Sequence, residues 1–147
     1  MPLSALPARP GTYVLILRLD APTRVAAGRL GAFDLSAGLY AYVGSAHGPG
    51  GLRARLERHL RRAKPQHWHI DALTAVAEPV AIWTRSAPDR LECVWARALA
   101  ALPGVTLPVA GFGASDCACP AHLLAFPGEM LPAAWDALGQ PDETHVT

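Results

Sequence analysis

The chain has 147 residues, of which 51% are hydrophobic and 17% are charged. This composition suits one globular domain and excludes a disordered or collagen-like chain. The formal net charge of +1 conceals an asymmetry, because residues 1–97 hold all 13 basic residues and 7 acidic ones, whereas residues 98–147 hold 5 acidic residues and no basic one. No apolar run reaches the length of a bilayer span, and three prolines interrupt the first ten residues. We therefore expect a soluble, cytoplasmic protein with no membrane partner.

Hydrophobic patterning predicts strands in the first third of the chain. Residues 11–19 form a continuous aliphatic run, which is typical of a strand buried on both faces. Residues 23–35 alternate weakly around two glycines and indicate a short hairpin. A second strand is predicted at residues 39–44, where Tyr40 and Tyr42 share one face because strand side chains alternate.

Helices and strands mix in the remainder. Leu52, Leu56 and Leu60 recur every four residues and predict a helix from Gly51 to about residue 63, ended by Pro65. Further elements are expected as a helix at 67–77, a strand at 79–84, a helix at 88–102 and a short strand at 122–126. We divide the chain into an N-terminal extension (1–10), a main domain (11–126) and an acidic tail (127–147) with one helical turn around Trp135 and a mobile end.

The three cysteines are an odd number in a chain without an export signal. This argues against a disulfide framework. We expect Cys93, Cys117 and Cys119 to be thiols or metal ligands.

The predicted helix after Gly51 carries a dense cluster of positive charge. Six basic residues and one acid, Glu57, lie between positions 53 and 64. Such a helix could contact phosphates. Charge alone favours a solvated helix face, with Glu57 paired to Arg53 and Arg61 at a spacing of four.

Arg55, His59 and Glu92 are candidates for chemistry. Arg55 and His59 share a helix face beside the leucine seam, where an arginine could hold a phosphate oxygen and a neutral histidine could relay a proton. Taken alone, a histidine there is more often a packed core residue. Glu92 could ligate a hard divalent ion, or it could be an exposed glutamate in the first turn of its helix. The glycine-rich loop at 44–51 lacks the ending of a nucleotide P-loop.

Several short motifs occur in an order that is characteristic of a known group of proteins. Gly11-Thr12-Tyr13, Tyr42-Val43-Gly44, Arg55, His59 and Glu92 together resemble the GIY-YIG nuclease superfamily. The longer segments 42–55, 67–71, 92–93 and 111–119 resemble, more narrowly, its DUF123 branch. The resemblance spans roughly residues 11–126.

The resemblance implies an α/β (α+β) fold: a small central, mainly antiparallel sheet flanked by helices, here with an inserted hairpin and a C-terminal extension. It also implies hydrolysis of DNA phosphodiester bonds. Glu92 would bind Mg²⁺ or Mn²⁺, and Arg55 would neutralise charge on the phosphoryl oxygens. Tyr13, Tyr42 or His59 would be the general base. The expected DNA contacts are Arg53, Arg58, Arg61, Arg62 and Lys64.

The branch-specific motifs leave two interpretations open. One is a structural zinc site, whose donors would be His67, His69, Cys117, Cys119 and His122. In the other, Trp68 and the histidines line the substrate groove, or Asp71 and Asp116 tie loops to it.

Three functions compete at this point. The first is a metal-dependent DNA endonuclease that acts on a repair or recombination structure. The alternative is a non-catalytic nucleic-acid-binding module that uses the basic helix at 51–63. The third is a protein-interaction module in which the acidic C-terminal half covers the basic face. Cutting both strands of a duplex with one active site would require two visits or a second copy, so a homodimer is one expected partner arrangement.

Overall fold

The structure, a computed structural model, describes residues 5–61, 64–65, 68–113 and 121–145. The strands are β1 (Gly11–Leu19), β2 (Thr23–Ala26), β3 (Ala32–Leu35), β4 (Gly38–Ala46), β5 (Glu78–Ser86), β6 (Leu123–Phe126) and β7 (Asp142–His145). The helices are α1 (Gly51–Leu60), α2 (His69–Thr74), α3 (Glu92–Ala100) and α4 (Leu131–Ala137), with short 3-10 turns η2 (Gly28–Leu30) and η3 (Gly128–Met130).

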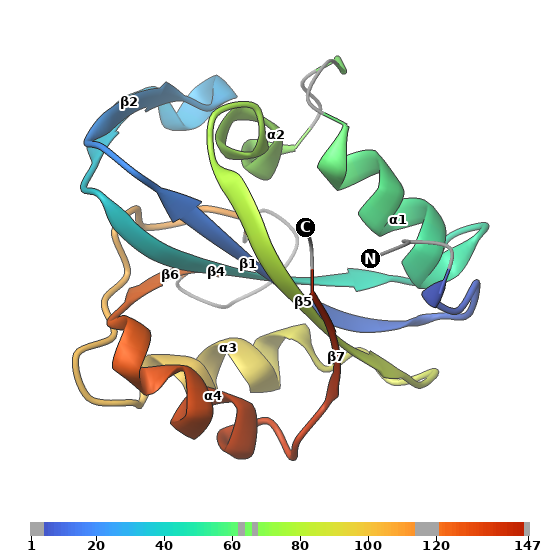
Figure 1. The fold of residues 1–147 in the computed structure, drawn as a ribbon. Helices are drawn as coiled ribbons and strands as arrows, with labels where there is room; N and C mark the ends of the chain where they lie inside the picture. The colour runs from blue at the N-terminus through green and yellow to red at the C-terminus, as the bar shows by residue number, and fades with distance from the viewer. Residues whose placement is uncertain (1–4, 62–63, 66–67, 114–120, 146–147) are drawn as a thin grey trace.

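One antiparallel sheet organises the domain (Figure 1). Its five strands follow the order β6-β4-β1-β5-β7, and every neighbouring pair is antiparallel. The apolar strand β1 lies at the centre, as its continuous hydrophobic run predicts. The hairpin expected between β1 and β4 is the separate two-stranded sheet formed by β2 and β3. The predicted α+β fold, a mainly antiparallel sheet flanked by helices, is confirmed.

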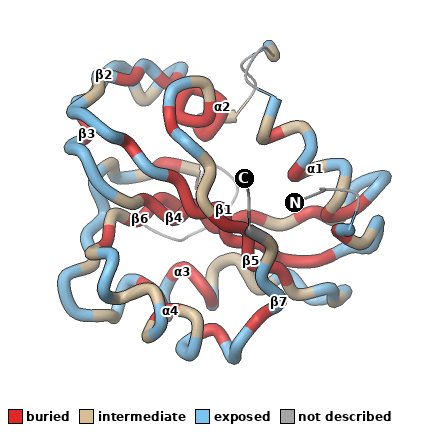
Figure 2. The backbone as a smooth tube through the Cα atoms, in the orientation of Figure 1, coloured by how far each residue is buried: buried red, intermediate tan, exposed pale blue. Residues whose placement is uncertain are grey.

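Helices cover both faces of the sheet, and each covered face forms a core. Odd-numbered positions of β1, such as Leu15, join the core under α1 and α2. Even-numbered positions, such as Ile16, join the core over α3 and α4. Buried positions follow the middle of the sheet while exposed ones follow the outer helix faces (Figure 2). Because both faces are covered, successive residues of β1 point alternately into the two cores.

Several helices are shorter than the pattern predicts, and side-chain hydrogen bonds account for their ends. The ammonium group of Lys64 donates to the carbonyls of His59 and Arg61 at the end of α1. At the start of α2, the carboxylate of Asp71 accepts the Trp68 backbone N–H at 2.9 Å. None of the helices in the described part of the chain is both long and apolar enough to cross a membrane.

The C-terminal segment is more ordered than expected. The single turn predicted around Trp135 is the seven-residue helix α4, and the end expected to be mobile contains β7, which pairs with β5. Trp83 of β5 donates from Nε1 to the Glu143 carboxylate at 2.7 Å. A short polar strand at the edge of a sheet has no hydrophobic alternation, so the sequence pattern does not predict it.

Candidate active site

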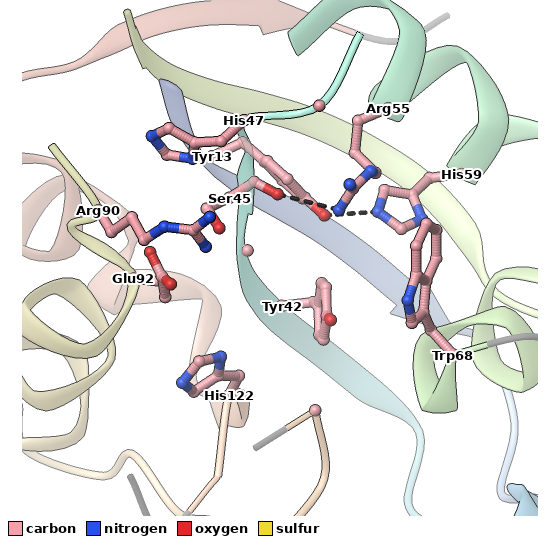
Figure 3. A pocket seen from close by; sticks show the side chains of 13 residues that line it. Tyr13, Tyr42, Ser45, His47, Arg55, His59, Trp68, Arg90, Glu92 and His122 are labelled. Atoms are coloured by element: carbon pink, nitrogen blue, oxygen red, sulfur yellow. Dashed lines mark hydrogen bonds between the residues drawn. The ribbon is translucent and has the colours of Figure 1, made fainter. Parts of the chain in front are cut away.

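A cavity of about 520 Å³ opens beside β4 and receives side chains from both helical layers (Figure 3). All five residues predicted to carry catalysis line it, although they come from four separate elements: Tyr13, Tyr42, Arg55, His59 and Glu92. In Figure 3, Glu92 lies on one side of the cavity, and Arg55 and His59 lie on the other. The fold thus gathers residues that are up to 79 positions apart in the sequence.

The glycine of the Tyr42-Val43-Gly44 motif provides the space for Tyr13. Tyr13 on β1 is paired directly with Gly44 on β4. A methyl group added at Gly44 would lie 2.5 Å from Cζ of the Tyr13 ring. Any larger residue at position 44 would therefore force the Tyr13 ring to shift.

Tyr13 and His59 form a buried hydrogen-bonded pair. The Tyr13 hydroxyl lies 2.5 Å from Nε2 of His59. Burial, reinforced by the positive charge of Arg55, lowers the pKa of His59 to about 3. Burial also raises the pKa of Tyr13 well above 10, while Arg55 acts in the opposite direction. Both side chains are therefore uncharged at neutral pH.

Tyr42 completes the aromatic wall of the cavity. Its ring centroid lies 6.0 Å from that of His59 and 6.4 Å from that of Tyr13. Burial raises the pKa of Tyr42 to about 12, and Arg55 partly opposes this effect. Its hydroxyl consequently keeps its proton near pH 7.

Arg55 is held from two sides. Its Nη1 donates to the Ser45 carbonyl at 2.9 Å, and its guanidinium carbon lies 4.5 Å from the Trp68 ring centroid. Arg55 also hydrogen-bonds the Tyr13 side chain, but an arginine has five N–H donors, so others are left for an anion in the cavity.

Trp68, in the motif at 67–71, also contacts a second arginine, Arg58. The Arg58 guanidinium carbon lies 4.3 Å from the Trp68 ring centroid. Arg58 also binds both carboxylate oxygens of Asp71, at 2.8 and 3.0 Å. The Asp71 side chain is fully buried, and this hydrogen bonding raises the pKa of Arg58. Trp68 therefore lies against both arginines, one in the cavity and one in a structural ion pair.

The basic residues expected to contact DNA are only partly available. Arg53 donates to the Leu6 carbonyl at 2.8 Å, and Arg58 is paired as described. Lys64 donates to Thr74 Oγ1 at 3.0 Å as well as to the end of α1. Arg61 is exposed, while Arg62 lies outside the described residues. Glu57 forms no ion pair with the described residues, so the two pairings expected from spacing are not formed.

Glu92 is the first residue of α3, and one of its oxygens has no partner in the described part of the chain. This atom, Oε2, is buried. An unpaired buried carboxylate oxygen is costly unless a cation or water binds it. Oxygen donors of this kind are the ligands that Mg²⁺ prefers. Glu92 therefore fits a divalent-metal ligand.

Further residues line the cavity that the motifs did not single out for it. They include Ser45, His47, Arg90 and His122. His122 was predicted either as a zinc ligand or as a residue lining the substrate groove; it lines the cavity, and its Nε2 lies 3.8 Å from Sγ of Cys93. Arg90 lies in a loop outside the sequence motifs, so only the structure associates it with the site.

The predicted zinc donors can be followed only in part. His67, Cys117 and Cys119, together with Asp116, lie outside the described residues. Nδ1 of His69 accepts the Gly113 N–H at 3.0 Å. Within the described ranges, no group of three or more histidine, cysteine or acidic residues could hold a metal. The expectation of free or metal-bound cysteines is wrong for Cys93, which is disulfide-bonded, because an odd cysteine count still permits one bridge.

The fold and the cavity define a small α+β domain with a polar pocket lined by tyrosines, a neutral histidine, arginines and a carboxylate. Residues 12–139 match the family described as "Domain of unknown function DUF123". The protein belongs to the DUF123 family, which confirms that part of the predicted resemblance. No curated protein and no solved structure matches the chain.

Proposed function

We propose that the protein is a metal-dependent endonuclease of the GIY-YIG superfamily that hydrolyses DNA phosphodiester bonds, on a repair or recombination structure. The convergence of Tyr13, Tyr42, Arg55, His59 and Glu92 in one cavity supports this proposal most strongly. Phosphodiester hydrolysis requires a group to orient water, a cation to neutralise the phosphoryl oxygens and a ligand for a metal ion. The cavity contains a candidate for each role.

Glu92 would hold Mg²⁺ or Mn²⁺ through the oxygen that has no partner in the described chain. When bound, the ion would polarise the phosphate and stabilise the departing oxyanion. A single protein carboxylate is sufficient for such an ion, because Mg²⁺ usually keeps several water ligands.

Arg55 would neutralise the negative charge that develops on the non-bridging phosphate oxygens. The bond to Ser45 and the contact with Trp68 fix its guanidinium group before substrate arrives. Preorganisation of this kind avoids an entropic cost during the reaction. Arg58 and Asp71 support the same arrangement indirectly, because they hold Trp68.

Tyr13 and His59 would move the proton of the attacking water. The water would transfer a proton to the Tyr13 oxygen while the Tyr13 hydroxyl proton passes to Nε2 of His59. The hydroxide oxygen would form the new bond to phosphorus as the phosphorus–oxygen bond to the leaving strand breaks, and the departing oxyanion would take a proton from solvent. His59 is neutral near pH 7, because burial lowers its pKa to about 3, so Nε2 has a free lone pair for the Tyr13 hydroxyl; proton transfer to it requires a nearby negative charge that raises this pKa. A bound anionic phosphate favours the transfer because it stabilises the imidazolium ion. Tyr42, whose pKa is about 12, would donate a hydrogen bond.

The alternative is a non-catalytic nucleic-acid-binding module. Its main support is the charge of α1, yet Arg53, Arg58 and Lys64 donate to acceptors within the protein. Their hydrogen bonds argue that much of this charge stabilises the fold. A buried carboxylate and a tyrosine–histidine pair also have no role in simple phosphate binding, so we favour the nuclease.

Incubation with nicked, flapped, branched, abasic and plain DNA tests the proposal. Purified protein should cleave at least one of these with Mg²⁺ or Mn²⁺ and cleave none with chelator. Arg55→Ala should abolish cleavage, whereas Arg97→Ala, an exposed arginine on α3, should not. Binding of DNA without cleavage of any substrate, under every metal condition, would support the binding module instead.

A further inference from the structure

Three hydrogen bonds hold the loop that joins β5 to α3, one to a residue of β1 and two to residues directly beside β1 and β4. The backbone N–H of Ala87 donates to the Pro10 carbonyl at 3.0 Å. Nε2 of His47 donates to the Pro88 carbonyl at 3.1 Å. The backbone N–H of Leu91 donates at 3.1 Å to Oγ1 of Thr12, which is fully buried in β1. The backbone on both sides of residue 90 is therefore held in place.

Arg90 extends from this fixed loop into the cavity (Figure 3). The residue is exposed, and it forms no ion pair with a described carboxylate. Glu92, two residues further along, lines the same wall without pairing with it. The loop thus fixes the backbone from which a guanidinium group without an ion-pair partner among the described residues reaches the cavity.

Arg90 and Arg55 lie on different walls of the cavity, with Tyr13, Tyr42 and Ser45 between them (Figure 3). Arg55 is associated with the proton-transfer pair, because its charge acts on both Tyr13 and His59. Arg90 is not associated with that pair but shares its wall with Glu92. A cavity of about 520 Å³ can hold more than one phosphate group, and two separated guanidinium groups suit two negative charges.

We propose that Arg90 binds a second backbone phosphate, adjacent to the scissile one on the same strand, so that the substrate is a polynucleotide strand and not an isolated phosphodiester. This inference rests on the proposed nuclease function. It assigns Arg55 to the scissile phosphate and Arg90 to the neighbouring phosphate. A contact to a flanking phosphate positions the strand and carries no sequence information.

Neutral methylphosphonate linkages, introduced one at a time around the scissile bond of a cleaved oligonucleotide, test the assignment. Wild-type kcat/KM should fall about ten- to hundred-fold when one particular flanking phosphate is neutralised, since a charge-assisted contact is lost. Arg90→Ala should lose a similar factor on the natural strand and should lose nothing further on that modified strand. Arg90→Lys, which keeps the charge, should recover part of the rate, and Arg97→Ala serves as the matched control.

Two results would contradict the assignment of Arg90 to a flanking phosphate. If Arg90→Ala cleaves the natural strand as fast as the wild type, Arg90 contacts no phosphate. If Arg90→Ala stays as sensitive as the wild type to every neutral linkage, the phosphate is bound elsewhere. If the wild-type protein cleaves no DNA at all, the proposed function itself has failed, which is a different result from either of these.

Discussion

Acidification should destabilise the domain through His59. The residue is 1% exposed, and burial lowers its pKa from 6.5 to about 3. The unfolded chain therefore binds a proton at a pH where the folded chain does not. This contribution to stability is complete above pH 6.5 and is lost as the pH falls toward 3. At about 1.36 kcal/mol per pH unit, the loss between pH 7.5 and pH 5 amounts to about 2 kcal/mol.

Urea unfolding of the wild type and of His59→Gln at both pH values measures this loss. All other titrating groups are common to the two proteins, so their effects cancel in the difference between the unfolding free energies. That difference should shift against the wild type by about 2 kcal/mol on going to pH 5. If the difference between the two unfolding free energies stays constant from pH 7.5 to pH 5, His59 is not a buried, neutral residue of the folded protein. Because its pKa is about 3, His59 itself should contribute no inflection near pH 6.5 to the pH profile of cleavage. Wild-type and His47→Gln profiles serve to separate its titration from that of another cavity histidine.

Two further substitutions probe packing around the site. Gly44→Ala should lower the unfolding free energy by about 1 to 3 kcal/mol, because the new methyl group meets the Tyr13 ring. The control Gly48→Ala, where an added methyl group has no atom within 4 Å, should change it by less than about 0.5 kcal/mol. Equal effects of the two substitutions in thermal unfolding would contradict this. Asp71→Ala should lower the unfolding free energy by about 2 to 3 kcal/mol, because it leaves the Arg58 guanidinium group without its buried carboxylate partner. Asp34→Ala, which removes an exposed ion pair, should lower it by at most about 0.5 kcal/mol. Similar losses for both aspartates in urea unfolding would show that the Asp71 pair contributes no more than a surface pair.

Local patterns in the sequence were sufficient to predict the centre of the fold. The run in β1 is apolar at nearly every position, and that pattern is characteristic of a strand covered on both faces. The leucines that recur every four residues in α1 likewise predict a helix with one buried face. The end of α1 was predicted less well, because it depends on the Lys64 ammonium group, whose contacts span the loop and α2.

The candidate site was predictable where short motifs carry it. Gly44 of the Tyr42-Val43-Gly44 motif leaves the space that the Tyr13 ring occupies, so this motif reflects a steric requirement of the site. The role of Arg58 was predicted as DNA contact, because nothing in a local pattern of charge reveals its partner Asp71, thirteen residues away. Arg90 is a single arginine in a loop, and only the folded chain brings it to the cavity.

Glu92→Gln, compared with the wild type on the same DNA substrate, tests the central claim most directly. The substitution keeps the size of the side chain and removes the charge that would bind a metal ion. We expect cleavage with Mg²⁺ or Mn²⁺ to fall at least about a thousand-fold, while the affinity for DNA, measured in parallel without metal, stays within about threefold of the wild type. Cleavage by Glu92→Gln at the wild-type rate would contradict the proposed active site.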